Sequence, residues 1–80
     1  MPSRRVVMYS RKACHLCDQA REVILAVRST NPFAFEEVSI DGDDDLERAY
    51  GLRVPVVEID GDPVFEFAVE PSRLAELVRP

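Results

Sequence analysis

The two cysteines of this chain lie three positions apart, where a short apolar segment gives way to an amphipathic one. Cys14 and Cys17 are its only cysteines, and the apolar residues 6–8 precede them. After the first cysteine, apolar side chains recur every three or four residues, which predicts a helix over about residues 15–29. The apolar stripe of this helix is Leu16, Ala20, Val23, Ile24 and Val27. A strand followed by this helix places the cysteines at a helix N-terminus, where free N–H groups and the dipole stabilise a reactive thiolate.

Strand and helix patterns alternate along the whole chain. We expect strands at residues 5–9, 33–40, 54–59 and 64–67, and further helices at residues 44–50 and from Pro71 onward. Gly51 is the kind of residue that ends a helix in a left-handed conformation. Asp60-Gly61 is a strong signal for a two-residue hairpin turn. The order β-α-β-α-β-β-α predicts an α/β fold in which a four-stranded mixed sheet carries helices on both faces.

Size and composition bound the class of protein. Eighty residues make a single domain, residues 1–80, and 46% apolar with 31% charged residues suits a soluble globular chain. No apolar run approaches the ~20 residues that cross a bilayer, and the run after Met1–Arg5 is too short for a secretory signal. We therefore expect a cytoplasmic protein with no membrane partner. In that reducing compartment a cysteine pair serves catalysis, redox sensing or metal binding more often than permanent cross-linking.

The net charge of −5 is unevenly distributed. Residues 1–30 hold six basic and two acidic residues, whereas residues 31–80 hold four basic and thirteen acidic ones. A positive potential around the cysteines favours a thiolate and attracts anionic partners. We expect no nucleic-acid partner, because the basic cluster is small, the whole chain is acidic and no aromatic stacking pattern accompanies the arginines. We expect a monomer.

Two segments of the chain resemble the glutaredoxins, and in particular the small bacterial glutaredoxin-like proteins. They are Tyr9-Ser10-Arg11-Lys12-Ala13-Cys14-His15-Leu16-Cys17 and Arg53-Val54-Pro55-Val56-Val57, the second followed by the hairpin signal. A C-x-x-C beside a strand-helix-strand pattern is a weak signal by itself. A Val-Pro step at the head of a later strand makes it much more specific. The resemblance covers nearly the whole chain and implies a thioredoxin-like fold.

The resemblance also implies a role for each matching residue. Cys14 corresponds to the more exposed, nucleophilic cysteine and Cys17 to the resolving cysteine. Pro55 corresponds to a cis-proline packed against the dithiol, and the Val54 backbone would hydrogen-bond an extended thiol substrate. Arg11, expected to contribute to substrate binding, stands where many glutaredoxins carry a lysine. The implied activity is thiol–disulfide exchange with protein or low-molecular-weight disulfides, and the reductant is either an unknown reductase or glutathione.

The chain departs from the glutaredoxin pattern at two places near this site. His15-Leu16 replaces the usual Pro-Tyr between the cysteines. Val69-Glu70-Pro71-Ser72 stands where glutaredoxins carry a Gly-Gly that receives the glutamyl end of glutathione. Glu70 would repel a carboxylate there, and the glycine backbone is lost. These differences make glutathione a doubtful co-substrate.

His15 is the only histidine, and two interpretations of it stay open. Its cationic form would lower the pKa of the Cys14 thiol and make the disulfide more oxidising; alternatively, it is an exposed helix residue of little influence. No resident metal is predicted, because Cys14, His15 and Cys17 offer three ligands at most and structural zinc takes four. Two other functions also stay open: a partner-binding module with a regulatory or vestigial dithiol, and a glutathione-dependent iron–sulfur carrier.

Overall fold

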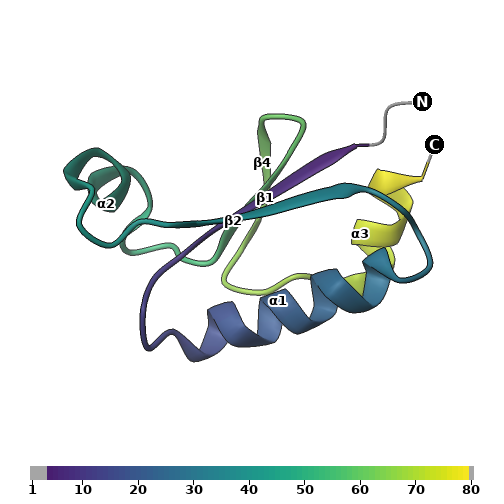
Figure 1. Ribbon diagram of the computed structural model, residues 1–80, viewed down its shortest axis with the longest axis horizontal. Helices are drawn as coiled ribbons and strands as arrows, with labels where there is room; N and C mark the ends of the chain where they lie inside the picture. Colours follow the sequence, from purple (N-terminus) through teal and green to yellow (C-terminus); the bar gives the residue numbers. More distant parts are fainter. Residues whose placement is uncertain (1–3, 80) are drawn as a thin grey trace.

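The computed structural model describes residues 4–79, which form three helices and four strands in the predicted order (Figure 1). The elements are β1 (Arg5–Ser10), α1 (His15–Arg28), β2 (Ala34–Ser39), α2 (Asp44–Tyr50), β3 (Val56–Ile59), β4 (Asp62–Glu66) and α3 (Pro71–Val78). Within this described part of the chain, no helix is long and apolar enough to span a membrane.

The four strands form one mixed sheet in the order β2-β1-β3-β4. β1 runs parallel to β2, because α1 returns the chain across the sheet between them, and antiparallel to β3. β3 and β4 are the arms of a hairpin. Its turn residues Asp60 and Gly61 have φ angles of 53° and 90°, as a type I′ turn requires. The predicted α/β fold is confirmed.

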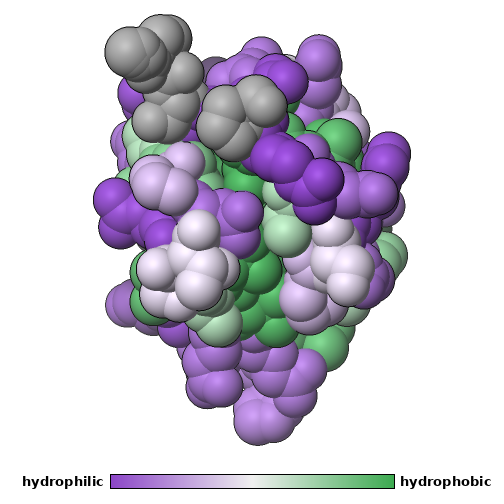
Figure 2. Space-filling view, turned by 90° about the vertical axis from the view of Figure 1, so that its right-hand side faces the viewer, coloured by the Kyte–Doolittle hydropathy of each residue, from purple (hydrophilic) through white to green (hydrophobic). Residues whose placement is uncertain are grey.

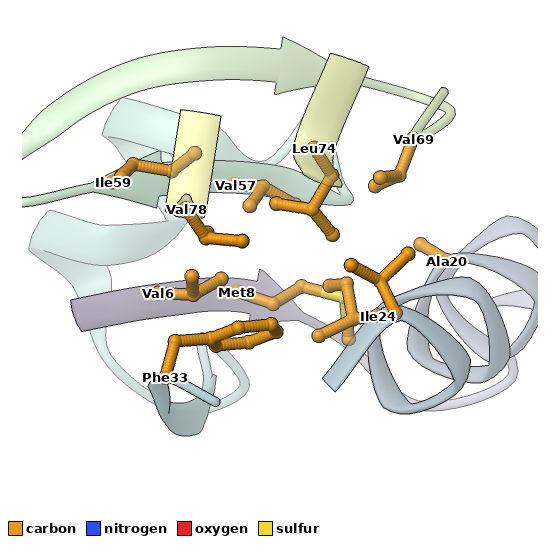
Figure 3. Close-up of a cluster of buried hydrophobic side chains, with 11 residues drawn as sticks. Val6, Met8, Ala20, Ile24, Phe33, Val57, Ile59, Val69, Leu74 and Val78 are labelled. Carbon is orange, nitrogen blue, oxygen red and sulfur yellow. The ribbon is translucent and has the colours of Figure 1, made fainter. Parts of the chain in front are cut away.

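The main core lies between the sheet and two helices, α1 and α3, on the same side of it (Figure 1). Figure 3 shows Val6, Met8 and Val57 of the sheet gathered with Ile24 of α1 and Leu74 of α3. These five side chains are all 0% exposed. Burying a side chain of this size contributes about 1.5–3 kcal/mol. The core therefore holds α1, and with it both cysteines, against the sheet.

The opposite face of the sheet is covered in part by α2. Tyr9 of β1 alternates with the core-facing residues, and its ring stacks on that of Tyr50 with the centroids 4.2 Å apart. The Tyr50 hydroxyl donates a hydrogen bond to the Glu58 carboxylate at 3.0 Å. Burial, together with this hydrogen bond, raises the pKa of Tyr50 to about 12. Helices thus lie on both faces, with α2 restricted to one end of the sheet (Figure 1).

An open groove of about 550 Å³ runs between α1 and α3. Its apolar lining includes Val23, Ala26, Val27 and Ala75. Figure 2 views the molecule from the right-hand end of Figure 1 and shows a strip of hydrophobic surface flanked by hydrophilic residues. The part of α1 that lines the groove begins at Glu22, so the groove lies along the helices rather than at the cysteines.

Leu16 does not lie where the helical periodicity placed it. Its side chain is 43% exposed, whereas Cys17, the next residue, is fully buried. The buried face of α1 consists of Cys17, Ala20, Ile24 and Val27. Because this row already meets the sheet, Leu16 is turned toward the rim of the interface, and the prediction that it belongs to the core is wrong. An exposed leucine therefore stands between the two cysteines.

Gly51 follows α2 for a different reason from the predicted one. Its φ of −53° is helical, not left-handed. A side chain is excluded there by crowding, since a Cβ atom would lie 2.4 Å from the carbonyl oxygen of Glu47. Every strand also differs from prediction by one or two residues at one or both ends. Near the cysteines, Val54 and Pro55 precede β3, and Phe67 follows β4.

An ion-pair network fixes α1 to the edge strand β2. Arg21 donates two hydrogen bonds to the carboxylate of Glu37, at 2.7 and 2.6 Å, and one to Asp18 at 3.0 Å. The Ser10 hydroxyl also donates to Glu37, at 2.7 Å. The hydrogen bonds from Arg21 are the main reason that the pKa of Glu37 is lowered. The Glu37 carboxylate consequently stays charged to a lower pH than an unpaired glutamate.

We expect Arg21→Gln to lower the free energy of unfolding by about 1 kcal/mol near neutral pH. The pKa of Glu37 is lower in the folded state than in the unfolded state. The stabilisation that its carboxylate contributes is therefore fully present above the unfolded pKa of about 4.3. That stabilisation is lost as the pH falls through the folded value. The difference between wild type and variant should therefore shrink in acid, which urea unfolding at a series of pH values measures.

The matched control for this experiment is Arg48→Gln. Arg48 pairs only loosely with Asp45, at 3.4 Å, and both side chains are largely exposed. This substitution should change stability little at any pH. A stability difference for Arg21→Gln that stays constant on acidification would contradict the role assigned to Glu37.

Candidate active site

Cys14 is the N-cap residue of α1, and its sulfur accepts a hydrogen bond from the helix. Its backbone is extended, with φ −109° and ψ 101°. The backbone N–H of Cys17 donates to the Cys14 Sγ at 3.1 Å, and that of Asp18 donates to the Cys14 carbonyl at 3.1 Å. Serine, threonine or aspartate oxygens usually accept such bonds at an N-cap. Here the sulfur takes that place, where the helix presents its positive end.

Cys17 lies one turn inside α1, directly behind Cys14. The two cysteines form a disulfide with their Cα atoms 5.1 Å apart. Cys17 is fully buried, while Cys14 is half-buried. Of the two sulfurs, therefore, Cys14 is the one that a molecule in solution can reach. This difference in exposure agrees with what the sequence resemblance implied for the pair.

The loop that leads into Cys14 is fixed by contacts with the segments on either side of α2. The Lys12 N–H donates to the Asp41 carboxylate at 2.8 Å, and the Arg11 guanidinium donates to the Gly51 carbonyl at 2.8 Å. Ala13 has a φ of 53°, a left-handed conformation that costs a non-glycine residue roughly 1–2 kcal/mol. The fixed loop sets the position of the Cys14 sulfur, and Arg11 is part of that arrangement.

Val54 and Pro55 lie beside this loop. The peptide bond between them is cis, as the resemblance implied. In the antiparallel pairing of β1 with β3, Tyr9 faces Val56, so the Val54-Pro55 step and the loop that follows β1 lie at the same end of these two strands. Pro55 is buried and Val54 half-buried.

His15 is the first residue of α1, and its side chain is exposed. It is adjacent in sequence to Cys14 and projects from the same helix end. The structure therefore brings together Cys14, Cys17, His15, Arg11 and the Val54-Pro55 step, all at one end of the sheet. Within residues 4–79, no group of three histidine, cysteine or acidic side chains could hold a metal ion.

Phe67 is a feature of this site that the sequence pattern did not reveal. Its φ is 69°, and the Ala68 N–H donates to the Glu66 carbonyl at 2.7 Å across it. These two features define a γ-turn of the rare, strained type. The Phe67 N–H donates to the Pro55 carbonyl at 2.9 Å. The alternation of apolar residues in the sequence had instead predicted Phe67 as the last residue of a strand.

Leu16 and Phe67 line a small pocket of about 90 Å³ along the first two turns of α1, the helix that begins after Cys14. Ala20, Val23 and Val69 contribute its other apolar walls. Both Leu16 and Phe67 are exposed, at 43% and 47% respectively. The immediate surroundings of the cysteines thus have an apolar side next to α1 and a polar side next to Arg11.

A second helix N-terminus lies close to this apolar side. Glu70 is the N-cap of α3, and its carboxylate accepts hydrogen bonds from the Ser72 and Arg73 N–H groups at 3.2 and 2.5 Å. The donors that an anionic ligand would use are therefore already bound to a carboxylate. In this position Glu70 both satisfies the helix end and places a negative charge there.

Comparison with known proteins identifies the relatives of the chain. It matches the Glutaredoxin-like domain (DUF836) over residues 5–79. The crystal structure of target protein XcR50 from X. campestris is 41% identical, with a TM-score of 0.75 over 90% of this chain and 92% of that one. The solution structure of protein Ne2328 from Nitrosomonas europaea is 25% identical, with a TM-score of 0.83 over 98% of this chain and 94% of that one.

Similarity in fold extends to the thioredoxins. The crystal structure of a thioredoxin from Fasciola hepatica is 21% identical, with a TM-score of 0.60 over 95% of this chain and 78% of that one. A search of curated proteins found no match. The three helices and the mixed sheet in the order β2-β1-β3-β4 agree with these likenesses. On the family match over residues 5–79, the chain belongs to the glutaredoxin-like domain family.

Proposed function

We propose that this protein is a thiol–disulfide oxidoreductase, in which the Cys14–Cys17 pair exchanges with protein or low-molecular-weight disulfides. One observation carries the proposal: the accessible Cys14 sulfur caps α1 and accepts the Cys17 N–H, while the second sulfur is buried behind it. A sulfur in this position is stabilised as a thiolate. A reducing cytoplasm suits such a pair, and because one chain carries both sulfurs a monomer suffices.

The proposed reaction has two steps. The Cys14 thiolate attacks one sulfur of the substrate disulfide, a new S–S bond forms, and the other half of the substrate leaves as a thiolate. The Cys17 thiolate then attacks the Cys14 sulfur and displaces the remaining half. Cys14 and Cys17 lose two electrons as their disulfide forms, the substrate gains them, and the two cysteine protons end on the two product thiols.

The Val54-Pro55 step would hold the substrate during these two reactions. Val54 precedes β3 and lies beside the loop that leads to Cys14. We propose that its backbone hydrogen-bonds an extended substrate, as a sheet edge pairs with an added strand. Arg11 would add positive charge at the same end of the sheet. Its guanidinium is anchored on the Gly51 carbonyl, so the charge has a fixed position relative to the loop.

Replacing each cysteine in turn tests the proposed roles. Cys14→Ser should abolish reduction of a small disulfide such as 2-hydroxyethyl disulfide, because no accessible nucleophile remains. Cys17→Ser should still perform the first step and stop at a mixed disulfide on Cys14, which mass spectrometry of the intact protein detects. If Cys14→Ser retains wild-type activity, the exchange proposal fails and a partner-binding module with a vestigial dithiol becomes the better interpretation.

His15 is proposed to tune Cys14. A cationic imidazole beside the N-cap would stabilise the thiolate, so His15→Ala should raise the pKa of the Cys14 thiol. The ultraviolet absorbance of the thiolate measures this in a Cys17→Ser background, where a single thiol titrates. Gln19→Ala, an exposed substitution one turn further along α1, is the control. An unchanged titration in His15→Ala would leave His15 without this role.

Glutathione is proposed to be a poor reductant of the disulfide, because Glu70 occupies the N-terminus of α3. Glu70→Ser keeps a capping oxygen and removes the charge. We expect it to raise the rate of reduction by glutathione about fivefold, as expected for relief of about 1 kcal/mol of like-charge repulsion at an exposed site. Reduction by the neutral thiol 2-mercaptoethanol should be unchanged. If glutathione reduces wild type and Glu70→Ser at equal rates, the Glu70 carboxylate does not disfavour glutathione.

A further inference from the structure

Two apolar side chains near the cysteines, Leu16 and Phe67, are not part of the core. Leu16 and Phe67 are 43% and 47% exposed, and neither belongs to the buried cluster that holds the helices on the sheet. They come from different elements, the first turn of α1 and the turn after β4. Even so, they line the same small pocket, of about 90 Å³. The fold therefore assembles an apolar surface at this place without burying it.

The backbone of Phe67 has an unusual conformation. A φ of 69° is strained for an aromatic residue, whereas glycine adopts it without steric cost. The turn itself needs only backbone groups: the Ala68 N–H to the Glu66 carbonyl, and the Phe67 N–H to the Pro55 carbonyl. An exposed ring on a strained backbone contributes little to the stability of the fold. Strain of this kind near an active site is a basis for proposing a functional role.

The position of the two side chains connects them with the proposed exchange reaction. Leu16 lies between Cys14 and Cys17 in sequence, and Phe67 is hydrogen-bonded to Pro55 through its backbone. Figure 1 shows the segment that follows β4 passing alongside α1 before α3 begins. A polypeptide joined to the Cys14 sulfur and lying along Val54 would therefore extend past Leu16 and Phe67.

The charge next to this surface limits what would bind there. Val69 forms one wall of the pocket, and Glu70 follows it directly with a carboxylate at the start of α3. An acidic substrate side chain would meet this like charge, whereas an apolar one would cover the exposed surfaces of Leu16 and Phe67. The chemistry of the surface thus favours a substrate whose cysteine has an apolar neighbour.

We propose that Leu16 and Phe67 determine specificity by selecting polypeptide disulfides in which an apolar residue is adjacent to the reacting cysteine. This inference rests on the exchange function proposed above. In the first step the Cys14 thiolate attacks the peptide sulfur, and the partner thiolate leaves with the electron pair. The peptide is then attached to Cys14, with its neighbouring residue against Leu16 and Phe67. Cys17 releases it as a thiol when the Cys14–Cys17 disulfide forms.

Short peptides that carry one cysteine as a mixed disulfide with thionitrobenzoate provide the test. Two peptides differ only beside the cysteine, with leucine in one and aspartate in the other. The released chromophore reports the rate of attack by the reduced protein. We expect wild type to prefer the leucine peptide by about tenfold, which corresponds to about 1.4 kcal/mol. Phe67→Gly and Leu16→Ser should each reduce this preference several-fold.

The controls separate specificity from stability and from catalysis. Leu25→Ser removes a leucine that is 45% exposed on the same helix but away from the pocket, and it should leave the preference unchanged. Phe67→Gly relieves the strained turn, so it should fold at least as stably as wild type in urea unfolding. Leu25→Ser should also reduce 2-hydroxyethyl disulfide at the wild-type rate, because Leu25 lies outside the pocket. For Phe67→Gly and Leu16→Ser the measured quantity is the ratio of the rates for the two peptides, so a change in the general reactivity of Cys14 cancels.

The possible outcomes separate this inference from the proposed function. If wild type fails to reduce even 2-hydroxyethyl disulfide, the exchange function itself is wrong. If it reduces that disulfide but attacks both peptides equally fast, the exchange function stands and the selectivity is refuted. A preference for the leucine peptide that survives in both Phe67→Gly and Leu16→Ser would likewise overturn the assignment of specificity to these residues.

Discussion

The antiparallel pairing of β1 with β3 is the contact on which the candidate site depends. Its register sets Tyr9 opposite Val56, and the positions beyond this pair are therefore the loop before Cys14 on one strand and the Val54-Pro55 step on the other. Because β1 is also central in the sheet and packed beneath α1, its end is fixed on several sides. A shift of one residue would turn every side chain of β1 to the wrong face and separate the proline from the cysteines.

Two helix N-termini near this site are capped by chemically different groups, one reactive and one not. The end of α1 is capped by the Cys14 sulfur, and that of α3 by the Glu70 carboxylate. In the first case the positive end of the helix acts on a group that can react. In the second case, the N–H groups at the start of α3 are already bound to the carboxylate of Glu70. The contrast accounts for a site that is proposed to activate a thiol and yet to disfavour an anionic co-substrate.

Much of this arrangement is predictable from the sequence, because the responsible signals are local. Apolar periodicity predicts the strands and helices, Asp60-Gly61 predicts the hairpin, and the cis peptide bond before Pro55 follows from the family resemblance. The cysteine spacing likewise places both sulfurs at the start of α1. Periodicity also fails in specific places. It assigned Leu16 to the core, because a pattern shows which residues share a helix face but not where the covering sheet ends.

The sequence by itself determined the order of elements, the hairpin turn at Asp60-Gly61 and the cysteine pair at a helix start, since each depends on neighbouring residues. Tertiary structure alone decided that the Glu70 carboxylate caps α3 and that Leu16 and Phe67 share one exposed surface. These properties arise where segments distant in sequence meet. The left-handed φ of Phe67 is one example, because the turn forms only where the end of β4 is bonded to the Pro55 carbonyl.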